Sequence, residues 1–123
     1  MRKASPSGTM KVESEERRER MRVMLSFTIQ PEKGDALIKE GRIGETLESI
    51  LEDLQPEVAY FTDVEGTRGG YLVVNIDDAS QIPAMTEPLL LGVGATVQMH
   101  PVMTPEDLRG AEESLQQMGQ KYG

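Results

Sequence analysis

RVMLSFTI, residues 22–29, alternates between a mixed side and a strongly apolar side, and the apolar side consists of Val23, Leu25, Phe27 and Ile29. A period of two residues predicts a β-strand that packs one face against a core. The same period returns at residues 71–77, where the apolar side is Leu72, Val74 and Ile76. We therefore expect two strands that contribute to one hydrophobic core.

Helical patterns lie between these strands and after the second one. Gly41 and Gly44 are expected to divide residues 32–54 into a short and a longer helix, with an apolar stripe at Ile43, Leu47, Ile50, Leu51 and Leu54. Ser80 is expected to cap a second helical region. Pro88 is expected to kink or end that region, because proline lacks the backbone donor that a helix interior needs.

Two shorter segments, residues 58–63 and 95–99, complete a set of four predicted strands, and residues 64–70 predict the turn between the second and third. Thr104 and Pro105, followed by two acidic residues, predict the start of a C-terminal helix. The order strand–helix–strand–strand–helix–strand predicts an α+β, ferredoxin-like fold with a C-terminal helix. Such a fold has a four-stranded antiparallel sheet, with the first and third strands central and both connecting helices on one face.

The composition excludes several classes of protein. With 123 residues, the chain is expected to form one domain over residues 21–123, behind a charged tail at residues 1–20 that is expected to be disordered. The chain has no cysteine, which excludes disulfides and thiolate metal sites, and we predict no metal site and no cofactor. Its net charge of −8 disfavours nucleic acid as a partner, and no apolar run has membrane-spanning length. We expect a soluble, cytoplasmic protein.

The side chains opposite the predicted core form a second sheet face of unusual composition. They are small, aromatic or amide-bearing, with almost no lysine or glutamate: Met24, Ser26, Thr28, Tyr60, Thr62, Tyr71, Val73, Asn75, Gln98 and His100. A sheet face in water usually carries charged residues, and short chains often cover such a face by association. We therefore expect a homodimer in which two sheets pack face to face.

Three motifs resemble a known family. PEVAYF (56–61), DDASQIPAMTEP (77–88) and HPVMTPEDL (100–108) resemble uncharacterised bacterial proteins of the dimeric α/β-barrel superfamily. More distantly, the pattern is similar to muconolactone isomerase and to small cofactor-free monooxygenases. The resemblance implies two ferredoxin-like protomers with a small organic ligand within or beside their sheets. The group often has an aromatic pair where this chain has Leu89 and Leu90, so a pocket lined there would have a different shape.

Few residues are candidates for chemistry or ligand binding. His100 is the single histidine, and is either a general base or a histidine held by a neighbouring carboxylate or carbonyl. Tyr60 and Tyr71 lie on adjacent predicted strands, where two phenols either bind a carbonyl or enolate oxygen or form an interface pair. The other candidate ligand-binding residues are Asn75, Gln98 and Ser26.

Two functions follow from this surface, and the sequence leaves both open. In the first, a dimer binds a small organic metabolite, and any reaction is a proton transfer by His100. In the second, a non-enzymatic homodimer fills the mixed face entirely with its partner and has no ligand cavity. A pocket between the sheet and the helices is a further alternative, with a different lining: Phe27, Glu87, Leu89 and Leu90.

Overall fold

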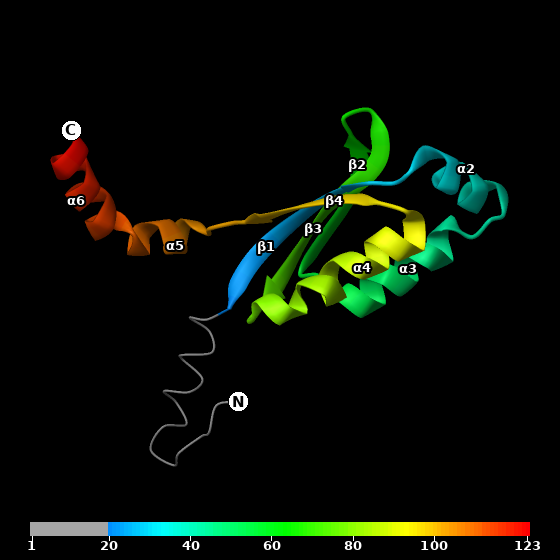
Figure 1. The fold of residues 1–123 in the computed structure, drawn as a ribbon, viewed down its shortest axis with the longest axis horizontal. Coiled ribbons are helices and arrows are strands. Elements are labelled where there is room, and N and C mark those ends of the chain that lie inside the picture. The colour runs from blue at the N-terminus through cyan, green and yellow to red at the C-terminus, as the bar shows by residue number, and fades with distance from the viewer. Residues whose placement is uncertain (1–19) are drawn as a thin grey trace, which may run out of the picture.

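The computed structural model describes residues 20–123, which form a four-stranded sheet with helices against one face (Figure 1). The predicted tail at residues 1–20 lies outside the described residues, apart from Arg20. Neighbouring strands are antiparallel in the order β2-β3-β1-β4, so the predicted four-stranded antiparallel sheet is confirmed. The strands are β1 Met21–Thr28, β2 Val58–Val64, β3 Thr67–Ile76 and β4 Thr96–Pro101.

Helices connect the strands and follow the last of them. The chain turns between the first two helices at Gly41, which has a φ of 69°, whereas Gly44 lies inside the second helix. None of the helices in residues 20–123 combines the length and the apolar character needed to cross a membrane. The helices are α2 Pro31–Lys39, α3 Ile43–Leu54, the 3-10 turn Ala79–Gln81, α4 Ile82–Val93, α5 Pro105–Gly110 and α6 Glu112–Tyr122.

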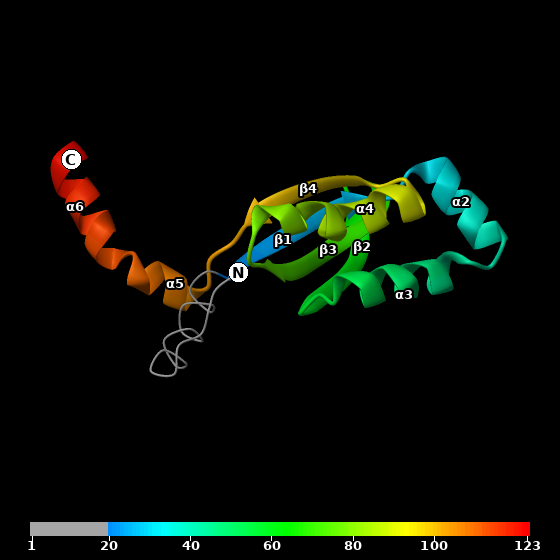
Figure 2. The same cartoon turned by 60° about the horizontal axis from the view of Figure 1, so that its bottom comes forward.

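The hydrophobic core lies between the sheet and the pair α3 and α4, which run side by side across one sheet face (Figure 2). The apolar sides predicted for the two central strands are buried there, with Leu25 and Phe27 at most 1% exposed. Burial of such side chains is the main favourable contribution to folding, at roughly 25 cal/mol per Å2. The helices supply the opposite wall of the core with Leu37, Ile50, Leu54, Leu89 and Val93.

The hairpin between β2 and β3 differs from the sequence prediction. The sequence predicts a turn over residues 64–70, but the turn consists of Glu65 and Gly66, with φ of 53° and 80°. Gly69 and Gly70 belong to β3, and a Cβ atom on either would overlap a backbone carbonyl of the neighbouring strand. These glycines therefore permit close approach of strands, a role that composition alone does not distinguish from turn formation.

Two features of the second helical region also differ from the prediction. Asp78, and not Ser80, caps the 3-10 turn before α4, since its carboxylate accepts hydrogen bonds from the backbone and side chain of Ser80. Pro88 does not end the helix, which continues to Val93. Leu89 and Val93 are fully buried in the core, so packing holds the helix together past the proline.

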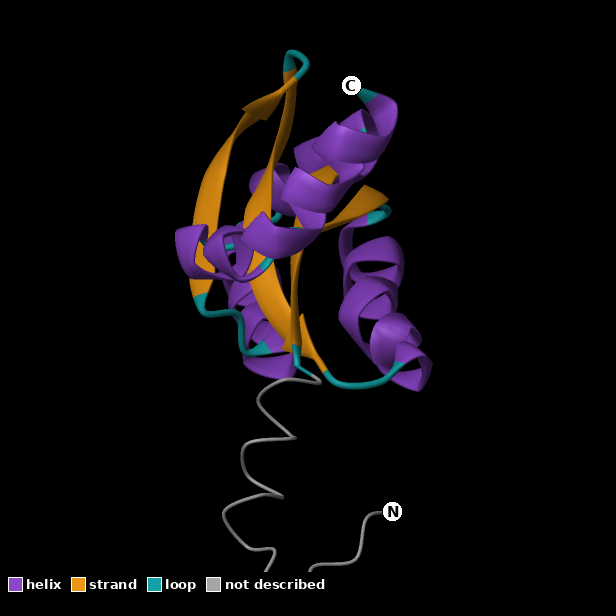
Figure 3. Ribbon diagram, turned by 90° about the vertical axis from the view of Figure 1, so that its left-hand side faces the viewer, coloured by secondary structure: helices purple, strands orange, loops and turns teal. Residues whose placement is uncertain are grey.

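The C-terminal helix is divided into two helices that project from the domain. Thr104 and Asp107 form a reciprocal capping box at the start of α5: the backbone N–H of Thr104 donates to the Asp107 carboxylate, and the backbone N–H of Asp107 donates to the Thr104 hydroxyl oxygen. The hydrogen bond from the Thr104 backbone is the main cause that holds the pKa of Asp107 below its usual value. The chain bends at Ala111, and α6 follows. Both helices extend beyond the end of the sheet, away from α3 and α4 (Figures 1 and 2), so they lie nearest the viewer in the end-on view of Figure 3. Residues 102–123 are called the C-terminal arm below.

Candidate functional site

The sheet face away from α3 and α4, called the open face below, carries the candidate residues in rows. Directly paired residues of neighbouring strands share one face of a sheet, with Cβ atoms about 5 Å apart. Strand register therefore places four predicted residues in one line across all four strands: Tyr60, Tyr71, Ser26 and Gln98. We call this line the central row, and it brings together residues from positions far apart in the sequence.

The rows on either side of the central row carry no lysine, arginine, aspartate or glutamate. One consists of Val58, Val73, Met24 and His100, and the other of Thr62, Gly69, Thr28 and Thr96. Tyr60 is 67% exposed, whereas Tyr71 and Ser26 at the sheet centre are half-buried. The open face is thus a largely uncharged surface that offers hydroxyl, phenol and amide groups.

His100 lies at the rim of this surface, near the end of β4. It pairs with Met24 and is exposed, and it stands two residues from Gln98, which corresponds to about 7 Å along a strand. Within residues 20–123, no ion pair involves His100. The structure therefore places His100 beside the central row, without the carboxylate that would orient it as a base.

Asn75 lies apart from the central row, at the end of the sheet where β1 begins. Its side-chain amide donates a hydrogen bond of 3.0 Å to Oε1 of Glu57, and Nε of Arg22 lies 2.8 Å from the same oxygen. These two hydrogen bonds hold the pKa of Glu57 below its usual value, and the bond from Arg22 has the larger effect. Sequence reasoning missed Glu57, although its position after Pro56 at the start of a predicted strand was a usable signal.

Replacing Glu57 by glutamine is expected to weaken the pH dependence of stability in acid. Because folding lowers the pKa of Glu57, its stabilising contribution is present above the ordinary value of 4.5 and is lost as the pH falls through the lowered value. Denaturant unfolding measured from pH 7 down to acid should show a shallower loss for Glu57→Gln than for the native chain. Arg22→Gln should reduce the same slope, and an unchanged slope in both variants would contradict this assignment.

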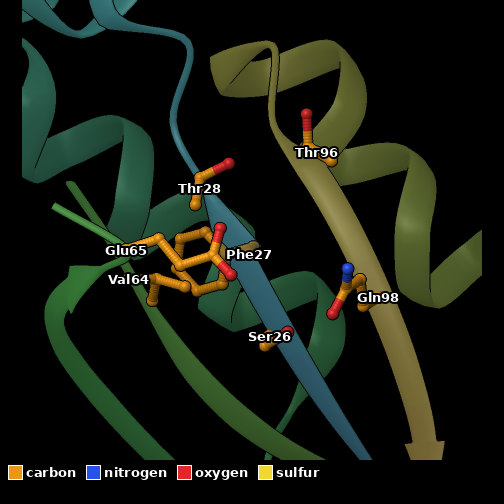
Figure 4. A pocket seen from close by; sticks show the side chains of 7 residues that line it. All are labelled: Ser26, Phe27, Thr28, Val64, Glu65, Thr96 and Gln98. Atoms are coloured by element: carbon orange, nitrogen blue, oxygen red, sulfur yellow. The ribbon is translucent and has the colours of Figure 1, made fainter. Parts of the chain in front are cut away.

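A small depression opens beside the central row, beneath the tip of the β2–β3 hairpin (Figure 4). Its volume is about 80 Å3, and Ser26 and Gln98 of the central row lie in its wall. Hydroxyl groups of Thr28 and Thr96 contribute further hydrogen-bonding capacity, and Glu65 supplies the only charge among the lining residues: Ser26, Phe27, Thr28, Val64, Glu65, Thr96 and Gln98.

Glu65 is the second residue that sequence reasoning missed. Its φ of 53° lies in the left-handed region, which non-glycine side chains seldom adopt outside turns. In a two-residue hairpin turn, positive φ at both central positions matches the twist of the strands, so the turn geometry fixes this conformation. The consequence is that a carboxylate is held at the edge of the depression, on the same side of the sheet as Ser26 and Gln98 (Figure 4).

No cavity described for residues 20–123 has the lining expected of the alternative pocket between the sheet and the helices. Phe27 and Leu89 are each 1% exposed, and both belong to the hydrophobic core. Glu87 is exposed on the surface of α4. A wider groove on the helix side lies between α3 and α4, but it includes neither Phe27 nor Leu89. In residues 20–123, no cluster of histidine and acidic side chains is arranged to hold a metal ion.

Comparison with known proteins adds one structural likeness. No protein-family model and no curated protein matches the chain. Among solved structures, the uncharacterized protein TM1266 from Thermotoga maritima is similar, with 20% sequence identity and a TM-score of 0.44 over 68% of this chain and 99% of that one. A likeness of this degree assigns neither a family nor a function to the chain.

Proposed function

We propose that the protein is a homodimer of ferredoxin-like protomers of the dimeric α/β-barrel type, which binds a small organic molecule between or beside its two sheets. The observation that supports this proposal is the central row together with the depression next to it. The row offers phenol, hydroxyl and amide groups, and no charged group, across the full width of a sheet face that residues 20–123 leave uncovered. Groups of this kind orient a small ligand without requiring a charged partner.

The composition of the open face supports association through it. The central row and the two rows beside it combine partly exposed apolar side chains with neutral hydrogen-bonding groups. Val58, for example, is 37% exposed in the row next to Tyr60. Interfaces between proteins are depleted in lysine and glutamate and enriched in tyrosine and methionine at their centre. The open face has the same character, with Tyr60 and Tyr71 in the central row and Met24 in the row beside it.

The depression indicates the chemistry of the ligand. Glu65 and the hydroxyl groups around it accept hydrogen bonds, so they favour a neutral or cationic ligand that carries hydroxyl or amine donors. In a dimer, the sheet of the second copy would cover the depression and enlarge the enclosed volume. Any reaction of the ligand would be a proton transfer by His100, with the phenols of Tyr60 and Tyr71 binding its oxygen atoms.

A second candidate function is supported by the size of the depression. Its volume of about 80 Å3 is well below the roughly 300 Å3 of an ordinary ligand site. If the second copy fills the open face completely, the protein is a non-enzymatic homodimer without a ligand cavity. The two candidates share the dimer and differ only in whether a ligand binds, so two separate measurements distinguish them.

Association through the open face predicts a specific effect of charge. Ser26→Arg places a guanidinium at the centre of the face, where burial in a dimer would leave it unpaired. Size-exclusion chromatography with light scattering should give twice the chain mass of 13.6 kDa for the native protein and the single mass for Ser26→Arg. Ser49→Arg, which adds the same charge to the exposed surface of α3, should stay dimeric. A native chain of 13.6 kDa mass at all concentrations would refute the dimer.

Ligand binding is tested by a thermal-shift screen of small metabolites on the native protein. A ligand present at 100 times its dissociation constant stabilises the native state by about 2.7 kcal/mol, which raises the melting temperature by on the order of 10 °C. Gln98→Ala and Glu65→Asn should abolish the shift for a ligand of the depression, and Asn keeps the left-handed turn residue acceptable. If every shift survives both variants, the depression is not the site. If no metabolite in the screen produces a shift, the second candidate function is favoured.

A further inference from the structure

We propose that the C-terminal arm of each chain packs against a second copy of the chain, in an apolar groove beside its edge strand β2. This inference rests on the homodimer of the proposed function and adds the contact that completes it. The two surfaces involved are both present in one chain, and neither is covered by another part of residues 20–123. Their positions at opposite ends of the sheet determine which copy can bring them together.

The arm carries an apolar stripe that does not contact its own domain. Leu115, Met118 and Tyr122 recur at three- and four-residue spacing along α6, and each is about half or more exposed. Leu108 of α5 is 48% exposed as well. Both helices project away from the sheet and from α3 and α4 (Figures 1 and 2). An isolated helix of 11 residues is marginal in water, so α6 needs a surface on which to bury its apolar stripe.

The groove that fits this stripe lies between the start of α3 and the β2–β3 hairpin. Its volume is about 480 Å3, and its apolar wall is formed by Ile29, Ile43, Leu47 and Phe61. Phe61 is 49% exposed, although its ring meets Phe27 of the core edge to face at 6.3 Å. The groove is thus an extension of the core on the helix side of the sheet, and residues 20–123 leave it uncovered.

The arm of a chain lies far from the groove of the same chain. The groove lies at the sheet end where β1 finishes, since Ile29 directly follows that strand. The arm begins after Pro101, which pairs with Val23 near the start of β1. The arm then points away from the sheet (Figure 2). A second copy that runs in the opposite direction brings its arm to this groove, and symmetry makes the exchange mutual.

The area needed by a stable dimer favours the same occupant. A sheet of four strands about 4.8 Å apart and about seven residues long covers only about 400 Å2, and a stable interface buries about 800 Å2 on each partner. At about 1.5 Å per residue and about 10 Å in width, α5 and α6 add about 250 Å2 on the arm, and about as much on the groove that receives it. Mutual arm exchange therefore supplies the area that the open faces lack.

Paired variants of α6 test the contact. Leu115→Glu with Met118→Glu places two charges on the apolar stripe, whereas Gln117→Glu with Gln120→Glu places the same charges on the opposite side of the helix. Each change occurs twice in a symmetric dimer, so we expect the first pair to raise the dimer dissociation constant at least about 100-fold and the second to leave it near the native value. Sedimentation equilibrium measures both values, and equal constants for the two pairs would overturn the inference.

Crosslinking identifies the receiving surface. The chain has no cysteine, so single introduced cysteines react at known positions. Chains with Met118→Cys, mixed with chains of a different tag length carrying Leu47→Cys, should join through a short bis-maleimide. The control Ser49→Cys lies on the same helix α3, two residues from Leu47, and should not join to Met118→Cys.

The outcomes separate this inference from the proposed dimer. A crosslink with Leu47→Cys that is absent with Ser49→Cys supports arm exchange. A dimer of native mass that is broken by Ser26→Arg but gives no arm crosslink overturns arm exchange and leaves the proposed dimer intact. A native chain that is monomeric at all concentrations overturns both.

Discussion

Replacing Gly69 by alanine is expected to lower the free energy of unfolding by about 3 kcal/mol or more. The added methyl group overpacks the sheet, and the backbone itself would have to move to make room for it. Gly69 lies in β3 opposite Thr28, and a Cβ atom there would overlap the carbonyl oxygen of Phe27. That oxygen belongs to the backbone of the neighbouring central strand, so it cannot rotate away as a side chain can. The pairing of β1 and β3 must open locally to admit the methyl group.

The matched control is Gly44→Ala in α3. Among residues 20–123, a Cβ built on Gly44 meets nothing within 4 Å beyond its chain neighbours and the backbone of its own helix, and alanine is the better helix former. We therefore expect Gly44→Ala to raise the free energy of unfolding by about 0.5–1 kcal/mol. Urea denaturation followed by far-UV circular dichroism measures both changes. Equal stability of Gly69→Ala and the native chain would show that the strands are farther apart than this structure places them.

Truncation of Phe27 to alanine is expected to cost about 3–5 kcal/mol of stability, the range for removing a buried phenylalanine. Phe27 is 1% exposed, and its ring belongs to the hydrophobic core between the sheet and the helices. Removal of the ring would leave a cavity in this core, and its neighbours can fill a cavity only in part. The chain is short, so this loss is a large part of its total stability.

Phe61 provides the comparison for Phe27. Both phenylalanines pair with Gly70, and their rings meet edge to face over that glycine, at an interplanar angle of 81°. Phe61 is 49% exposed, so Phe61→Ala should cost less than half as much as Phe27→Ala in a monomer. Under the arm-exchange proposal, Phe61→Ala should also weaken the dimer, whereas a cost equal to that of Phe27→Ala would contradict the burial seen here.

The alternating patterns were sufficient to predict the sheet. Residues 22–29 and 71–77 carry their apolar side chains at every second position, and the structure buries those side chains. The start of β3 could not be found in this way, because Gly69 and Gly70 have no side chain to alternate. Their role depends on the carbonyl groups of neighbouring strands, which a local sequence pattern does not contain.

The candidate site was predictable in part. Parity along each strand predicted that Tyr60, Tyr71, Ser26 and Gln98 share a face, but only register shows that they share one row. Asn75 has the same parity as Tyr71, yet its amide is bound to Glu57 at the end of the sheet. Glu65 was hidden because its place at the depression follows from the curvature of the hairpin, which is a property of the folded strands.

The placement of the tyrosines has a spectroscopic consequence. The chain has no tryptophan and three tyrosines, and these lie on the open face and at the tip of the arm. The tyrosine absorbance and fluorescence of the protein therefore originate outside the hydrophobic core. Dilution of a dimer should change the emission while the secondary structure is intact, so an optical titration without any dye would follow subunit separation directly.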